Sequence, residues 1–177
     1  MSSGSSSHSF NPSESPNYGF QVPETPSRNL RTFLAYVDAL HSWDLVAMLD
    51  CFDDSLEHRI LPQSMGRPVL NKRQYGEYFK GLMPLFKSFE LSIHEVIEAD
   101  DKMTVHTTST GESPTGVPYI NESILMIHFV APPPDAGPNA LPRIRLVKEF
   151  NDSESNLKFF KEARAKEKLR QASGSRG

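Results

Sequence analysis

The chain has 177 residues, a formal net charge of −3 and a hydrophobic content of 37%. That length suits one domain with loose ends, and the small net charge gives no reason to expect nucleic acid as a partner. A single cysteine excludes an internal disulfide. No long apolar run occurs near the N-terminus, so we expect no secretory signal or membrane anchor. We therefore expect a cytoplasmic protein with no membrane partner.

Residues 1–26 are rich in Ser and Pro and carry no apolar period. Such a segment cannot offset its ordering entropy, so we predict a disordered tail, with docking of Tyr18 and Phe20 on the domain as the less favoured alternative. The domain itself is expected to span residues 27–162. Residues 163–177 then form a charged helical extension that frays at its end.

Three helices are predicted in the N-terminal half of the domain. Ser27 is a plausible N-cap for the first, because apolar residues recur after it at helical spacing. Ser42 is expected to cap a short second helix, with Asp44 in its first turn. Asn71 is a suitable cap for the third helix, which Pro84 ends or kinks.

The remaining pattern predicts five strands. They span residues 56–61, 89–98, 103–110, 119–130 and 143–150, and a helix capped by Ser153 follows. Residues 119–130, YINESILMIHFV, form the most apolar run and are expected to be the central strand, while the proline-rich residues 131–142 form a loop. Because sequential strands pair with their neighbours, we predict an α+β fold. It has a curved, mostly antiparallel sheet, three helices over the concave face, a C-terminal helix, and a cavity between sheet and helices.

Motifs distributed over residues 29–162 have the forms H-x-x-L-P, S-x-G-x-P, Y-x-N-E and E-F-x-D-S. This combination resembles the SnoaL-like branch of the nuclear transport factor two-like superfamily, and within it an uncharacterised fungal subgroup. The resemblance implies a cone-shaped fold, the chemistry of small polyketide cyclases, isomerases or dehydratases, and a homodimer formed through the convex sheet face. Two departures stand out: residues 131–142 replace a short turn, and Ser123 stands where an aromatic is expected, which would enlarge or wet the pocket.

Two histidines and one glutamate on predicted strands are candidates for acid–base catalysis. His58 shares its face with apolar neighbours, so a buried imidazole could act as general acid or base, although a core histidine is the alternative. Glu122 would have a raised pKa if it faced the cavity, but it could instead pair with a cation at the strand edge. His106 lies among threonines, on either a polar pocket strip or an exposed sheet face.

Two further carboxylates, Glu149 and Asp152, end the last strand. A carboxylate here resembles the position of the general base in SnoaL-like cyclases. Asp152 could instead cap the following helix. His58, Glu122 and Asp152 are our first choices for the catalytic group.

Aromatic residues at helical spacing supply either a core or a pocket wall for substrate binding. They are Tyr36, Trp43, Tyr75 and Tyr78. Asn121 has the opposite strand parity to Glu122, and the sequence leaves open which of the two faces inward. Cys51 lies in the apolar stretch AMLDCF, which favours a buried, inert thiol over a nucleophile.

The chain contains no H-x-H, no H-E-x-x-H, no cysteine pair, no glycine-rich phosphate loop and no G-x-S-x-G. We therefore expect no metal, no cofactor and no serine-hydrolase chemistry. The leading hypothesis is a cofactor-free isomerase, cyclase or dehydratase that abstracts a proton beside the carbonyl of an apolar secondary metabolite. The alternative is a non-catalytic module of the same fold that binds a small molecule or a protein.

Overall fold

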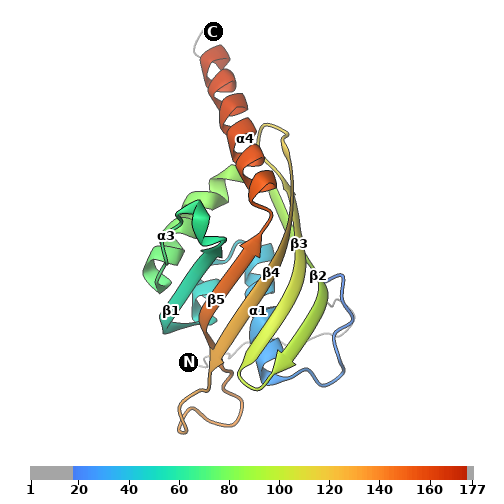
Figure 1. Cartoon of the computed structure of the whole chain (residues 1–177), viewed down its shortest axis with the longest axis vertical. Coiled ribbons are helices and arrows are strands. Elements are labelled where there is room, and N and C mark those ends of the chain that lie inside the picture. The colour runs from blue at the N-terminus through green and yellow to red at the C-terminus, as the bar shows by residue number, and fades with distance from the viewer. Residues whose placement is uncertain (1–17, 175–177) are drawn as a thin grey trace, which may run out of the picture.

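The computed structural model describes residues 18–174, and its sheet and helices form a single cone (Figure 1). The elements are α1 (Arg28–His41), α2 (Leu45–Asp50), β1 (Phe52–Leu61), η2 (Gln63–Met65), α3 (Lys72–Leu82), η3 (Met83–Leu85), β2 (Ser88–Ala99), β3 (Lys102–Glu112), β4 (Pro118–Val130), β5 (Arg143–Asn151) and α4 (Ser153–Gly174). The sheet order is β1-β5-β4-β3-β2, which confirms β4 as the central strand. Strands β2 to β5 form an antiparallel meander and β1 pairs with β5 in parallel. The predicted α+β class is confirmed.

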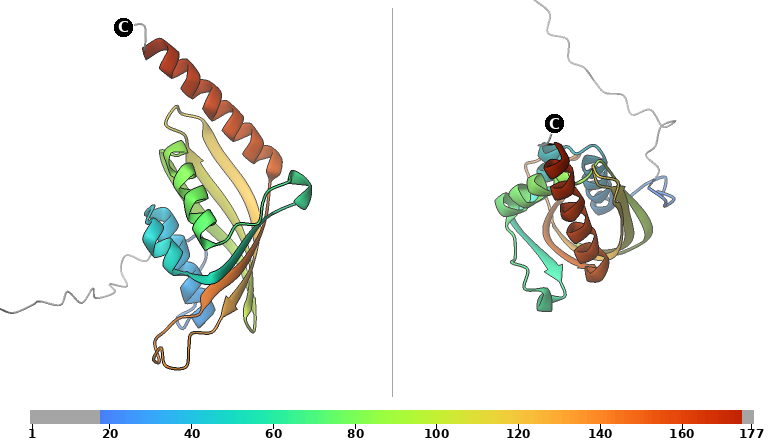
Figure 2. Two further views of the ribbon diagram at one scale, coloured as in Figure 1. Left: turned by 90° about the vertical axis from the view of Figure 1, so that its left-hand side faces the viewer. Right: turned by 90° about the horizontal axis from the view of Figure 1, so that it is seen from above.

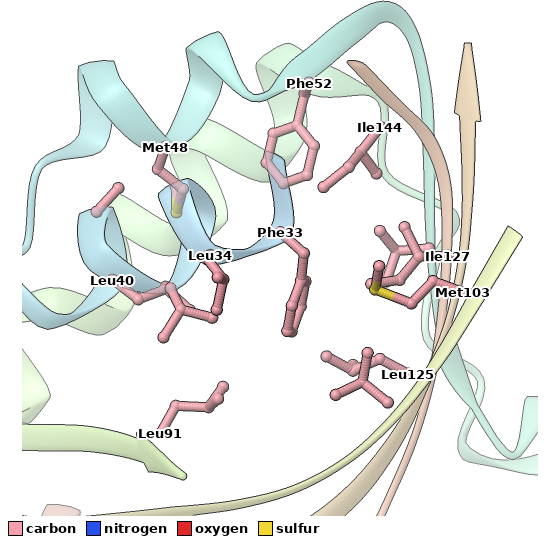
Figure 3. Close-up of a cluster of buried hydrophobic side chains, with 14 of the residues drawn as sticks. Phe33, Leu34, Leu40, Met48, Phe52, Leu91, Met103, Leu125, Ile127 and Ile144 are labelled. Atoms are coloured by element: carbon pink, nitrogen blue, oxygen red, sulfur yellow. The ribbon is translucent and has the colours of Figure 1, made fainter. Parts of the chain in front are cut away.

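Helices α1, α2 and α3 lie on the concave side of the curved sheet, whereas α4 projects from the end of the cone (Figure 2). The core fills the space between them. Phe33 of α1 and Met48 of α2 lie on the helical side, Phe52 lies at the start of β1, and Met103 and Ile127 lie on the sheet; each of the five is at most 2% exposed (Figure 3). Burying side chains of this size supplies roughly 1.5–3 kcal/mol each, so this cluster holds the helices against the sheet.

The inward face of the sheet changes from apolar to polar along its strands. Ser123 on β4 lies opposite Thr107 on β3 and Asn151 on β5. Two residues further along β4, Leu125 begins the apolar part, and Ile127 continues it. One end of the cone is therefore packed with hydrocarbon, and the other carries polar side chains.

The predicted caps are correct at two of four positions. Ser27 caps α1 and Asn71 caps α3. Ser42 does not begin α2; its hydroxyl instead bonds to the carbonyl groups at the end of α1. Asp44 caps α2, because its carboxylate accepts the backbone N–H of Ala47 at 2.9 Å. Ser153, expected to cap the last helix, is the first residue of α4, and Asp152 before it accepts the N–H groups at the helix start.

The N-terminal segment is ordered from Tyr18 onward, so the predicted disorder through residue 26 is wrong for residues 18–26. The Tyr18 hydroxyl donates to Asp38 at 2.7 Å, and the backbone N–H of Ile93 donates to the Tyr18 carbonyl oxygen at 2.6 Å. Phe20 and Val22 pack against the core. These contacts offset the entropy cost of ordering the segment, which its composition could not reveal. The rest of the predicted tail lies outside the described residues.

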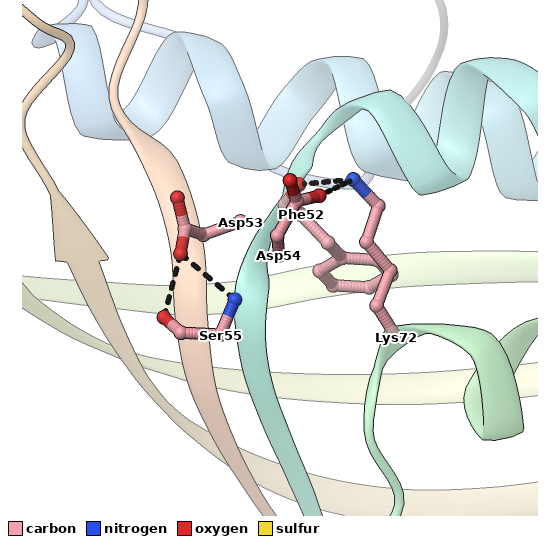
Figure 4. Close-up of polar contacts among 5 residues, drawn as sticks. All are labelled: Phe52, Asp53, Asp54, Ser55 and Lys72. Atoms are coloured by element: carbon pink, nitrogen blue, oxygen red, sulfur yellow. Dashed lines mark hydrogen bonds and ion pairs between the residues drawn. The ribbon is translucent and has the colours of Figure 1, made fainter.

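Strand β1 begins four residues earlier than predicted, at Phe52, and its start is held by polar contacts (Figure 4). Lys72 donates to the Phe52 carbonyl oxygen and to the Asp54 carboxylate, both at 2.9 Å. The Asp53 carboxylate accepts the backbone N–H and the hydroxyl of Ser55. The alternation of apolar residues cannot reveal this part of the strand, because polar side chains hold it.

Helix α4 runs without interruption across the boundary predicted at residue 162. Phe159 and Ala163 on this helix are buried with Val117, which precedes β4. The charged extension is therefore the outer part of one helix whose base belongs to the domain.

Candidate functional site

A cavity of about 130 Å³ lies between the polar part of the sheet and the helices. Its helical wall contains all four of the aromatic residues predicted for substrate binding: Tyr36, Trp43, Tyr75 and Tyr78. Its sheet wall carries His58, Thr107, Ser123, Glu149 and Asn151. An engineered apolar cavity of roughly 150 Å³ binds benzene, so this space suits a single ring.

His58 and Glu149 form the only predicted pair of catalytic candidates that the described structure brings together in the cavity. The Nε2 atom of His58 lies 3.4 Å from Oε2 of Glu149, and the side chains are 3% and 28% exposed. The carboxylate is therefore the member of the pair that a ligand reaches. Since an ionised carboxylate accepts and does not donate, this contact places a proton on Nε2. Within residues 18–174, the buried Nδ1 has no hydrogen-bond partner.

Glu149 is held in its ionised form. Burial alone would raise the pKa of this carboxyl group, but the hydrogen bond and charge of His58 outweigh it and hold the pKa below its usual value. The Asn151 amide also lowers it, donating from Nδ2 to Oε1 at 3.2 Å. The cavity thus contains a charged acceptor among aromatic side chains.

Tyr36 and Tyr75 face the same space and share a hydrogen bond of 3.0 Å between their hydroxyl oxygens. Burial raises the pKa of both groups, so both stay protonated at neutral pH. The ring centroids of Tyr75 and His58 are 4.6 Å apart, which fixes the plane of the imidazole. One tyrosine hydroxyl uses its hydrogen within the pair, and the other keeps its hydrogen for a ligand oxygen.

The other predicted catalytic residues lie away from the cavity. Glu122 points outward from β4, with its side chain 69% exposed, and its carboxylate contacts Nε2 of His106 at 2.6 Å. Asp152 is exposed and accepts the backbone N–H groups of Glu154 and Ser155 at the start of α4, so it serves as the cap that was its alternative role. Strand parity and helix capping explain these placements, and neither residue reaches His58.

Asn121 faces inward, which answers the question that parity left open, but it does not line the cavity. It is 2% exposed, and its Nδ2 donates to the Asp152 carbonyl oxygen at 2.7 Å. Ser123 lines the cavity in its place and donates its hydroxyl to Asn121 Oδ1 at 3.3 Å. The resemblance had already marked Ser123 as a substitution that would wet the pocket.

A larger depression of about 720 Å³ lies under the loop of residues 131–142. Cys51 borders it, and burial raises the pKa of this thiol to about 11, so the thiol is protonated at neutral pH. The thiol donates to the Ala47 carbonyl oxygen at 3.4 Å. The smaller cavity is the stronger candidate, because it combines an ionised carboxylate, a histidine and tyrosine hydroxyls.

Residues 33–131, more than half of the chain, match the family model described as the SnoaL-like domain. The chain belongs to the SnoaL-like family. The curated protein named Monooxygenase AacuO, from Aspergillus aculeatus, is 30% identical over 92 residues, which cover 51% of this chain and 58% of that relative. Monooxygenase ptaG from Pestalotiopsis fici is 27% identical over 141 residues, covering 78% of this chain and 92% of that relative.

The crystal structure of BvnE pinacolase from Penicillium brevicompactum has a TM-score of 0.64 at 24% identity, and the match covers 78% of this chain and 94% of that chain. This likeness shows the fold, and with the family match it confirms the predicted SnoaL-like branch and nuclear transport factor two-like cone. Among residues 18–174, no helix combines the length and apolar character needed to cross a membrane. In the same part of the chain, no three potential metal ligands converge.

Proposed function

We propose that the protein is a small enzyme of secondary metabolism that moves a proton next to a carbonyl group of an apolar substrate without a cofactor. The reaction would be an isomerisation, a cyclisation or a loss of water. The observation that carries the proposal is the ionised Glu149, which faces an aromatic cavity and is held from behind by His58.

The geometry gives each group a role in proton transfer. Glu149 is the exposed member of its pair, so its carboxylate takes the substrate proton and later returns it. A bound substrate displaces water from this carboxylate, and the loss of solvation strengthens it as a base. The free hydroxyl hydrogen of the Tyr36–Tyr75 pair is available to an enolate oxygen.

The convex face of the sheet supports a second part of the proposal, a homodimer. Ile124 on β4 and Phe150 on β5 lie opposite each other and are 37% and 51% exposed, and Ile120 on the same face is 64% exposed. Exposed apolar groups clustered on one sheet face are typical of a protein interface. Sedimentation velocity at several concentrations tests this, and Ile124→Glu should shift a dimer to a monomer; a monomer throughout would contradict the dimer.

Two alternatives have specific support. A non-catalytic binding module is supported by the small size of the cavity, which holds one ring. Oxygenation is supported by the names of the curated relatives, which are called monooxygenases. An oxygen electrode separates oxygenation from the leading proposal, because proton transfer alone consumes no O₂.

The chain offers a matched control for testing the catalytic pair, because it holds a second His–Glu pair outside the cavity. We would measure deuterium exchange from D₂O into the methyl group of acetophenone, a single-ring ketone, by NMR. Glu149→Gln should lower the exchange rate by roughly 10²–10⁴-fold, the usual contribution of a positioned base. Glu122→Gln removes the outer pair and should leave the rate unchanged. Equal rates for the Glu149→Gln variant and the wild type would overturn the proposed function.

A further inference from the structure

The polar side chains of the sheet wall form one continuous row across three strands. Thr107, Ser123 and Asn151 stand opposite one another in register on β3, β4 and β5. They are 1%, 8% and 7% exposed, and all three line the cavity. We refer to them as the sheet-wall row.

The hydroxyl hydrogens of the sheet-wall row are committed to other groups, and so is one of the two hydrogens of the Asn151 amide. The Thr107 hydroxyl donates to the Ser123 carbonyl oxygen at 3.4 Å, and the Ser123 hydroxyl donates to Asn121. The Asn151 amide donates to Glu149 Oε1. That last contact also fixes the orientation of the amide, because the reverse orientation would set two oxygens against each other.

Apart from the second hydrogen of the Asn151 amide, the row has acceptors left to offer. Asn151 Oδ1 is buried and has no hydrogen-bond partner in the described structure. The two hydroxyl oxygens keep lone pairs, and the Glu149 carboxylate next to the row only accepts. A buried acceptor without a partner costs roughly 1–3 kcal/mol, and this free energy is recovered by a ligand that donates to it.

From this arrangement we infer that the sheet-wall row is a subsite for a hydrogen-bond donor, with Asn151 as its specificity-determining residue. The ligand it selects is a hydroxylated ring, such as a phenol or an enol, in preference to the same ring with an apolar group at that place. The ring packs against the aromatic wall of the cavity and its hydroxyl group points to the row. The inference rests on the proposed function only in placing the substrate in this cavity.

The matched control is Asn156, a second amide that lines the same cavity. Its Oδ1 already accepts the Tyr119 hydroxyl at 3.0 Å, so it has no comparable need for a donor. Replacing either asparagine with leucine keeps a side chain of similar size, but only Asn151→Leu removes an unpaired acceptor.

The experiment measures the affinities of phenol and toluene, which have nearly the same shape, by isothermal titration calorimetry. We take the ratio of the two dissociation constants in each variant, so that changes in packing cancel. Asn151→Leu should lower the preference for phenol by roughly tenfold, as expected for the loss of one buried hydrogen bond. Asn156→Leu should leave the ratio unchanged. Ser123→Ala should lower it by a smaller factor, and it carries the test if Asn151→Leu does not fold by circular dichroism.

An unchanged ratio in the row variants, an equal fall in Asn156→Leu, or no binding of phenol at millimolar concentration would overturn the inference. Binding does not depend on turnover, so the two proposals fail separately. If Glu149→Gln keeps full exchange activity while the phenol preference depends on Asn151, the proposed function is wrong and the donor subsite stands.

Discussion

His58 and Glu149 meet across a parallel strand pair although they are not opposite each other in the ladder. His58 pairs with Val147, whereas Glu149 pairs with Ile60. A diagonal contact between strands is within reach of long side chains, and here it brings Nε2 within 3.4 Å of the carboxylate. The contact exists only because β5, the last strand along the chain, lies beside β1 in the sheet.

The ionised state of Glu149 predicts a pH dependence of stability. Its pKa is lowered in the folded protein, so its ionisation stabilises the fold above the ordinary carboxyl pKa, and this contribution is lost as pH falls through the lowered value. Urea unfolding at pH 7 and at about pH 3 should therefore show a larger loss of stability in the wild type than in Glu149→Gln, since glutamine does not titrate. Equal losses in both proteins would contradict the prediction.

The hydroxyl pair of Tyr36 and Tyr75 predicts non-additive substitutions. Tyr75→Phe leaves the Tyr36 hydroxyl without its partner in a buried site, and should cost roughly 1–3 kcal/mol in the free energy of unfolding. In the double variant Tyr36→Phe/Tyr75→Phe both polar groups are gone, so the cost should be less than the sum of the single costs. A double-mutant cycle in urea checks this, and strict additivity would show that the hydroxyl groups do not interact.

Trp43 predicts an optical signal for occupancy of the cavity. It is the single tryptophan of the chain, it lines the cavity, and its ring lies 5.5 Å from Phe79 and 5.6 Å from Phe89. A ring bound there displaces water from the indole, so its emission should shift to shorter wavelength on titration with phenol. Phe79→Ala widens the cavity, so the emission shift at saturating phenol should be smaller in this variant. Ile120→Ala, on the convex face, should leave the shift unchanged.

Asp152 predicts a substitution that separates stability from chemistry. Its carboxylate caps α4 and bonds to the Ser155 hydroxyl at 2.7 Å, and these hydrogen bonds lower its pKa. Asp152→Ala should lower the thermal midpoint slightly, because N–H groups at the start of α4 lose their acceptor. The acetophenone exchange rate should stay at the wild-type level. A large fall in that exchange rate with an unchanged thermal midpoint would contradict this prediction and indicate a catalytic role for Asp152.

The sequence predicted the helices, the meander and the aromatic wall, because their periodicity is local. It placed His58 on the correct face for the same reason. It could not rank Glu149 above Glu122, because both carboxylates sit on strands and only the register shows which one faces His58. The parallel pairing of β1 with β5 could not be predicted either, because it joins segments far apart in the chain. The sheet-wall row is equally a product of register, although Ser123 had been marked by its departure from the family pattern.

Each outer strand of the sheet has backbone groups on its free side that already have partners. On β2, the backbone N–H of Leu91 donates to the His41 imidazole at 3.0 Å, and that of Ile93 donates to the Tyr18 carbonyl oxygen. On β1, His58 exchanges two backbone hydrogen bonds with Leu70, at 2.8 and 2.9 Å. An incoming strand from another molecule would find these groups occupied, which disfavours strand addition at these positions. The exposed apolar groups on the outer surface of the sheet therefore lie between two edges that are partly protected against strand addition.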